Sequence, residues 1–227
     1  MRFSKAMLQD GAKRMNTWLK KGEGLPNWLK MTDMDNKKEH KLTPKQYSGL
    51  YESRNMFWIK NGREPNYVTL TANANNPLVM DYQNTNYTCC PTSLSMASQL
   101  LYNYKSEQTC AKALGTSPGS GTSPTQLINN APKLGFTIIP IPRKSSEVKK
   151  YLSKGWPVIG HFQTNQTKAC KGDYSGSFGH YCLIWNTTSS EYVIADPSKG
   201  VNRKYKFACF DKANQGYRNN YYVVKPK

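Results

Sequence analysis

The residues best suited to chemistry are a cysteine, a histidine and an aspartate, each in a short motif. Cys89 lies in a Thr-Cys-Cys-Pro run, His180 in Gly-His-Tyr and Asp196 in Ala-Asp-Pro. A thiol is a useful nucleophile only as thiolate, so a cysteine enzyme needs a base beside the sulfur, a group that orients the base, and donors that face the developing oxyanion. The three motifs therefore predict a site built around a nucleophilic cysteine.

Spacing places the base and the carboxylate on one hairpin. Residues 181–185 and 192–195 have the composition of two strands, and a polar turn separates them. His180 and Asp196 lie equally far from the centre of this hairpin. An antiparallel register would set them opposite one another on the same face, with Cβ atoms roughly 5 Å apart. We therefore expect the carboxylate to hold the imidazole.

The cysteine is expected at the start of a helix. Pro91 suits a first helical turn, and apolar side chains recur at helical spacing from there to Tyr104. The helix macrodipole would favour a thiolate at Cys89. Gln83, six residues upstream, has a side-chain amide that can donate to an oxyanion together with a backbone N–H near the cysteine. Cys90 directly precedes the proline, which favours an extended backbone, and we interpret it as a packing residue.

Each of these residues also has an ordinary interpretation. A cysteine is most often a small buried apolar residue, and Asp-Pro is common wherever strands end. The four residues in this order are a more specific signal than any one alone. His161, in an apolar strand without a flanking acid, and His40, in a charged segment, are weaker candidates for the base than His180.

This order of motifs resembles the papain-like peptidases that include the bacteriocin-processing enzymes. Within that group, residues 88–96 are most similar to the pseudomurein endoisopeptidases of viruses and proviruses of methanogenic archaea. The resemblance extends roughly from residue 67 to the C-terminus. It implies that Cys89 is the nucleophile, His180 the base, Asp196 the orienting group and Gln83 the oxyanion donor. The second cysteine of the pair stands where many relatives carry glycine.

The resemblance also implies an activity. Such enzymes hydrolyse the isopeptide bond between alanine and the ε-amino group of lysine in pseudomurein cross-links, and so lyse methanogen walls. The chemistry needs no cofactor, but the resemblance implies a divalent cation, often calcium, for which the sequence offers no EF-hand or compact acidic cluster. The site alone leaves open a processing peptidase, an acyltransferase, and a non-catalytic wall-binding protein with a degenerate peptidase domain.

The amino-terminal part contains an internal repeat. Residues 14–28 parallel residues 54–67, with one extra residue in the first copy. Each copy is predicted to form an amphipathic helix stopped by a glycine, then Pro-Asn-aromatic and a short extended stretch. The second copy resembles the pseudomurein-binding repeat, a wall-anchoring module. Alternatively, the two helices only pack and bind nothing. Residues 31–45, rich in charge, are predicted to be a solvated linker.

Together these features predict an α+β chain of two parts. Residues 1–70 would form a helical cell-wall-binding region, and residues 71–227 a papain-like cysteine peptidase domain whose cysteine-bearing helix packs on an antiparallel sheet. Residues 73–77 are the expected joint. Besides the hairpin, strands are expected at 136–141, 157–162, 204–207 and 221–224.

The net charge and the cysteines indicate which partner and which cellular compartment to expect. The chain of 227 residues has a net charge of +18, from 32 Lys and Arg against 14 Asp and Glu, and the charges are scattered. The scatter indicates no specific nucleic acid, and an anionic wall, the partner we expect, explains the charge as well as DNA would. A basic nucleic-acid-binding protein, whose binding would depend steeply on salt, stays an alternative. The six cysteines lack zinc spacing, and residues 1–29 contain no apolar signal segment. We expect a monomer with free thiols and no membrane span, made in the host cytoplasm and acting on the wall at lysis.

Overall fold

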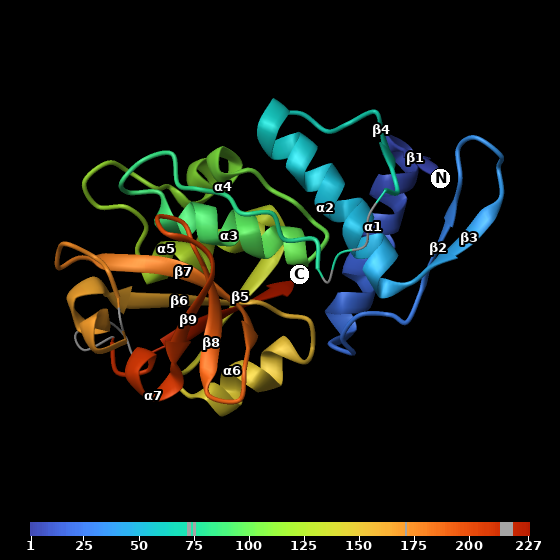
Figure 1. Cartoon of the computed structure of the whole chain (residues 1–227). Helices are drawn as coiled ribbons and strands as arrows, with labels where there is room; N and C mark the ends of the chain where they lie inside the picture. Colours follow the sequence, from blue (N-terminus) through green and yellow to red (C-terminus); the bar gives the residue numbers. More distant parts are fainter. Residues whose placement is uncertain (72–73, 75, 171, 214–219) are drawn as a thin grey trace.

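The protein is described by a computed structural model that covers residues 1–71, 74, 76–170, 172–213 and 220–227 (Figure 1). Positions 73 and 75 of the expected joint lie outside the described residues. Among its described residues, the amino-terminal part contains two helices and four short strands: β1 (Arg2–Ser4), α1 (Lys5–Lys21), β2 (Leu29–Thr32), β3 (Glu39–Leu42), α2 (Pro44–Asn61) and β4 (Tyr67–Thr69).

These elements form two similar units, each a strand, a helix and a strand. The units interlock, because β1 of the first pairs with β4 of the second, and β2 pairs with β3. Ser4 caps α1, and Thr43 caps α2 in a capping box with Gln46. Gly22 and Gly62 end the helices at φ 73° and 66°, a left-handed conformation that glycine adopts without a steric cost. The helix, glycine stop and extended stretch predicted for each copy are confirmed.

The prediction of a solvated linker at residues 31–45 is wrong. The segment contains most of a β-hairpin, in which Met31 pairs with His40 and both Met31 and Leu42 are buried. The Asp33 carboxylate stabilises its turn by accepting the backbone N–H of Asp35 at 3.0 Å. The charged residues dominate the composition of this segment, but two apolar side chains on one face suffice to fix the hairpin on the core.

The carboxy-terminal part is an α+β arrangement around one six-stranded sheet. All neighbouring strands pair antiparallel, in the order β5-β10-β6-β7-β8-β9. Helix α3, which bears the cysteine pair, packs on β7 and β6 of this sheet (Figure 1). The predicted fold class is therefore confirmed. The elements are α3 (Cys89–Leu100), α4 (Glu107–Leu114), α5 (Pro124–Asn130), η1 (Ala131–Leu134), β5 (Phe136–Pro142), α6 (Ser145–Leu152), β6 (Val158–Gln163), η2 (Thr164–Cys170), β7 (Gly179–Thr187), β8 (Glu191–Asp196), β9 (Gly200–Lys206), α7 (Phe207–Phe210) and β10 (Asn220–Pro226).

The two parts of the chain share one continuous apolar core. The Trp156 indole N–H donates to the Leu19 carbonyl at 2.7 Å, and the Asn16 amide donates to the Leu101 carbonyl at 2.9 Å. A division near residue 70 stays a prediction. None of the described helices is long and apolar enough to cross a membrane.

The predicted register of the β7–β8 hairpin is wrong by two residues. Leu183 pairs with Ala195, and a bulge interrupts the ladder between Ile184 and Asn186. The extra residue of the bulge and a turn of only three residues move the hairpin centre towards the C-terminus. An offset of two residues keeps both side chains on the same face, so His180 and Asp196 face each other on a diagonal rather than directly.

The expectation that all six cysteines are free is also wrong. Cys170, which ends η2, and Cys209, in α7, form a disulfide with Cα atoms 5.7 Å apart, a normal spacing for such a bond. The two segments are adjacent because η2 and α7 pack on each other. The remaining cysteines, Cys89, Cys90, Cys110 and Cys182, are free.

Candidate active site

Cys89 and Cys90 have different environments although they are neighbours. Cys89 is the first residue of α3 and is half-buried. Cys90, the second residue, is fully buried, and burial raises the pKa of its thiol well above the ordinary value. Cys90 is helical rather than extended as expected. Pro91 is tolerated after it because the first N–H groups of a helix have no intrahelical partner. The predicted packing role for Cys90 agrees with its burial.

His180 lies on β7 against both other predicted residues. Its Nε2 is 2.8 Å from Asp196 Oδ1, and both side chains are buried. Burial by itself lowers the pKa of the imidazole, but hydrogen bonds to Asp196 and to Cys89 outweigh it and hold that pKa above the ordinary value. The structure thus brings together the thiol, the imidazole and the carboxylate in the predicted order.

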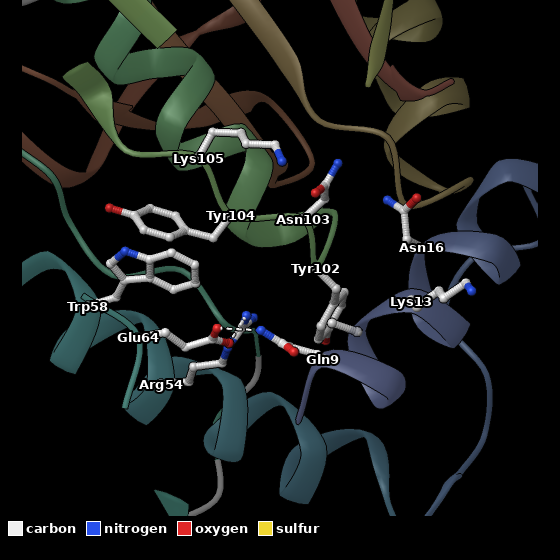
Figure 2. A pocket seen from close by; sticks show the side chains of 11 residues that line it. Gln9, Lys13, Asn16, Arg54, Trp58, Glu64, Tyr102, Asn103, Tyr104 and Lys105 are labelled. Carbon is white, nitrogen blue, oxygen red and sulfur yellow. Dashed lines mark hydrogen bonds and ion pairs between the residues drawn. The ribbon is translucent and has the colours of Figure 1, made fainter. Parts of the chain in front are cut away.

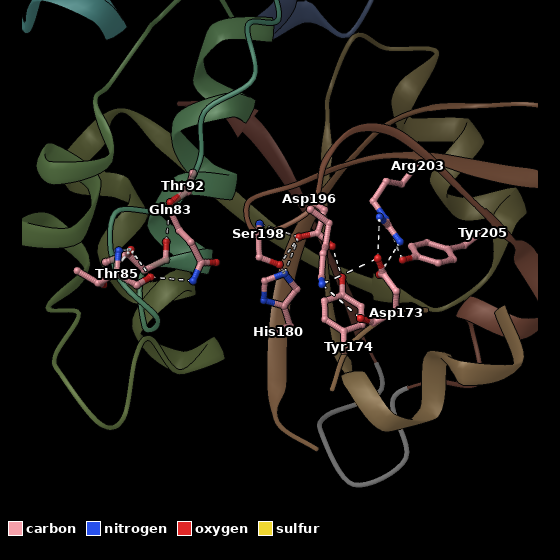
Figure 3. Close-up of polar contacts among 12 residues, drawn as sticks. Gln83, Thr85, Thr92, Asp173, Tyr174, His180, Asp196, Ser198, Arg203 and Tyr205 are labelled. Atoms are coloured by element: carbon pink, nitrogen blue, oxygen red, sulfur yellow. Dashed lines mark hydrogen bonds and ion pairs between the residues drawn. The ribbon is translucent and has the colours of Figure 1, made fainter. Parts of the chain in front are cut away.

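Asp196 is the most completely buried member, with no exposed surface. Besides His180, its carboxylate accepts the Ser198 backbone N–H at 2.9 Å, the Ser198 hydroxyl at 3.0 Å and the hydroxyl of Tyr174 (Figure 3). Burial raises the pKa of this carboxyl group, but the hydrogen bond with His180, supported by those from Tyr174 and Ser198, outweighs burial and leaves the pKa lowered. Asp196 is therefore held ionised at neutral pH.

Sequence reasoning missed Tyr174 and Ser198. Ser198 had a local signal, since an aspartate commonly accepts a hydrogen bond from the backbone two residues later. Tyr174 had none, because it belongs to an irregular segment that is held in place by an ion pair between Asp173 and Arg203 of β9, at 2.7 Å (Figure 3).

Gln83 belongs to the loop before α3, and a hydrogen bond connects this loop to the Ala-Asp-Pro motif that contains Asp196. The Gln83 backbone N–H donates to the Pro197 carbonyl at 3.0 Å, and its side-chain amide donates to the Thr85 carbonyl at 2.7 Å. An amide nitrogen has two hydrogens, so one is left for another acceptor. The next residue, Asn84, donates through its backbone and side chain to the buried Glu107, at 3.1 and 2.8 Å. Glu107 thereby fixes the loop.

The other two histidines are placed away from this cluster. His161 lies opposite Tyr181 on the neighbouring strand, on the other face of the sheet from His180, and its ring stacks on Tyr181 at 4.0 Å. Burial, with the nearby Arg143 charge, lowers the pKa of His161 to about 3, so it stays neutral. His40 lies on β3 in the amino-terminal part.

A divalent cation finds no ready site among the residues that the structure describes. Within those ranges, no three His, Cys, Asp or Glu side chains come together in a way that could hold a metal ion. Asp196, beside His180, and Glu107, beside Asn84, are already committed to hydrogen bonds. The residues present do not fit calcium, and no step of the chemistry below passes through it.

Comparison with known proteins gives one family and a shared fold. The family model described as Peptidase_C39 like matches residues 76–224. A putative C39-like peptidase from Bacillus anthracis is 16% identical with a TM-score of 0.51, over 66% of this chain and 95% of that one. The peptidase domain of Streptococcus ComA, a bifunctional ABC transporter involved in a quorum-sensing pathway, is 17% identical with a TM-score of 0.50, over 65% and 98%. No curated protein matches the chain. At these identities the structures support the fold alone.

Proposed function

Because the chain belongs to the Peptidase_C39 like family of cysteine peptidases, we propose that it hydrolyses the ε-(Ala)-Lys isopeptide cross-links of pseudomurein and so lyses methanogen cell walls. His180 contacts both Asp196 and Cys89, the first residue of α3, and this contact supports the peptidase activity in the proposal. The repeated amino-terminal units support the wall-binding part of the proposal, because they lie before the residues that match the peptidase family.

The geometry supports a two-step mechanism. The Cys89 thiolate attacks the carbonyl carbon of the amide, and the resulting oxyanion is held by the free N–H of the Gln83 amide and a backbone N–H at the start of α3. Protonated His180 gives its proton to the leaving lysine amine, which departs as the C–N bond breaks and the thioester forms. His180 then accepts a proton from water, which attacks the thioester and restores the thiolate. Asp196 keeps the imidazole in position throughout.

The remaining features fit an enzyme that acts on a wall from outside the cytoplasm. Such a monomer would be made in the host cell and meet the wall at lysis. A disulfide such as Cys170–Cys209 persists in oxidising surroundings, whereas cytoplasmic thiols are kept reduced. The net charge of +18 favours adsorption to an anionic polymer.

The test uses purified pseudomurein walls and a soluble peptide that contains an alanyl–ε-lysine bond, with a mild reductant and with calcium supplied. The native chain is expected to clear the wall suspension and to release new lysine ε-amino groups, whereas Cys89→Ala does neither. A native chain that cleaves the soluble peptide but leaves walls intact would instead be a processing peptidase. A chain that binds walls and cleaves nothing would be a non-catalytic wall-binding protein.

A further inference from the structure

The two amino-terminal units place equivalent residues in different surroundings. In each helix an arginine precedes a tryptophan by four residues: Arg14 and Trp18 in α1, Arg54 and Trp58 in α2. Such a pair lies on one helix face, and each unit therefore presents a similar surface of guanidinium and indole.

In the second unit this surface is covered by the rest of the chain. The Trp58 ring meets Tyr104 edge to face, with centroids 5.0 Å apart. Arg54 is buried and forms an ion pair with Glu64. The cavity of about 310 Å³ that remains lies between α1, α2 and the segment after α3, with Lys105 at its rim (Figure 2). The second unit thus uses its arginine–tryptophan face to attach to the peptidase part.

In the first unit the equivalent surface is open. Arg14 and Trp18 line a groove of about 510 Å³, and Leu25 and Trp28 from the following loop complete its apolar lining. Trp18 is 36% exposed and Trp28 is 48% exposed. A volume of this size is typical of small-ligand sites, and exposed indoles in a concave surface are groups that gain from a covering ligand.

Two lysine side chains lie over the indoles that line this groove. Lys21 Nζ lies 5.4 Å from the centre of the Trp18 ring, and Lys41 Nζ lies 5.1 Å from the centre of the Trp28 ring. Neither lysine has an ion-pair partner among the described residues. Glu23 is the only acid among the described residues that line the groove. An ammonium group therefore lies over the ring of each indole.

We propose that the groove of the first unit, lined by Trp18 and Trp28, binds an anionic saccharide of the cell wall. A sugar ring can place its C–H face on an indole while a carboxylate on that ring meets the adjacent ammonium group, and the Asn27 amide at the same groove offers hydrogen bonds to hydroxyls. The inference rests on the proposed wall-lysing function. It gives the two copies different roles: the first copy binds the wall, and the second copy attaches to the peptidase part. A nucleic acid would need a longer row of cations than the two unpaired lysines beside these rings.

The test measures binding of trigalacturonate, a carboxylate-bearing trisaccharide, to the full chain carrying Cys89→Ala, by quenching of tryptophan fluorescence and by calorimetry. Neutral chitotriose and a short oligothymidylate are the comparison ligands. The expected result is saturable binding of trigalacturonate, weaker binding of the other two, and at least a tenfold loss of affinity in Trp28→Ala and in Lys41→Met. Tyr67→Ala removes the equivalent exposed aromatic of the second unit and is expected to change affinity less than twofold.

The proposal is overturned if trigalacturonate does not bind saturably, if chitotriose or the oligonucleotide binds as tightly, or if Tyr67→Ala weakens binding as much as Trp28→Ala. Cleavage of the soluble isopeptide by the catalytically intact chain with Trp28→Ala distinguishes the two proposals. That cleavage is expected to stay at the native rate, because the groove lies on the amino-terminal part. A loss of trigalacturonate binding with intact peptide cleavage therefore concerns the groove alone.

Discussion

Replacing Asp196 by asparagine tests how the carboxylate sets the protonation of His180. The Asp196 carboxylate forms a buried, charge-assisted hydrogen bond with the imidazole at 2.8 Å. Such a bond contributes about 1.5–3 kcal/mol. At 1.36 kcal/mol per pKa unit, its loss corresponds to a fall of about 1–2 units in the pKa of His180. The imidazole would then lose its proton at lower pH.

The sign of the effect on activity follows from the mechanism. Protonated His180 donates to the leaving amine, and its raised pKa keeps that form populated to high pH, so activity is lost as pH rises through that pKa. In Asp196→Asn the alkaline limb of the kcat/KM profile, measured with the soluble isopeptide, is expected to move down by about 1–2 units. The maximal kcat/KM is expected to fall about 10²- to 10⁴-fold.

Asp10→Asn is the matched control, because it removes the same charge from an exposed side chain that pairs with Arg14 in the amino-terminal part. Its alkaline limb is expected to stay in place. An unmoved limb in Asp196→Asn, or an equal movement in the control, would refute the assigned role of the carboxylate.

Other predictions concern stability and the second thiol. Glu64→Gln leaves the buried guanidinium of Arg54 without its counter-charge, and is expected to lower the free energy of unfolding in urea titrations by about 3–5 kcal/mol. Asp10→Asn, at the exposed ion pair of the first unit, is expected to change that free energy by less than about 1 kcal/mol. Equal effects of the two substitutions would contradict the buried position of the Arg54–Glu64 pair. Replacing both Cys170 and Cys209 by serine is expected to lower the free energy of unfolding by about 4 kcal/mol, because the disulfide closes a loop with a sequence separation of 39 residues. If both thiols of the native chain react with a thiol reagent, the disulfide is absent. Cys90→Ala is expected to keep kcat/KM within about twofold and to cost at most about 3 kcal/mol of stability; loss of turnover in a folded variant would reassign the nucleophile.

The fold and the cluster around His180 could be predicted because the signals are local. Strands and helices follow from period and capping, as at Thr43 and Gly62, and residues of one hairpin stay close whatever its register. The exact register could not be predicted, since a single bulged residue after Ile184 shifts the ladder without changing the alternation that a strand requires.

What the sequence did not reveal depends on contacts between distant segments. Cys170 and Cys209 are adjacent only because two short helical segments pack together. Tyr174 reaches the carboxylate of Asp196 from an irregular segment. The hairpin around Met31 depends on burial against helices that composition does not show.

The position of the acyl group during turnover shows which residue is the nucleophile. A labelled peptide with an alanyl–ε-lysine bond is mixed with the native chain, the reaction is quenched in acid, and mass spectrometry of the digest locates the thioester. We expect the acyl group on Cys89 and no adduct in Cys89→Ala, as a nucleophilic role of Cys89 requires. An acyl group on Cys90, or turnover without any thioester, would contradict it.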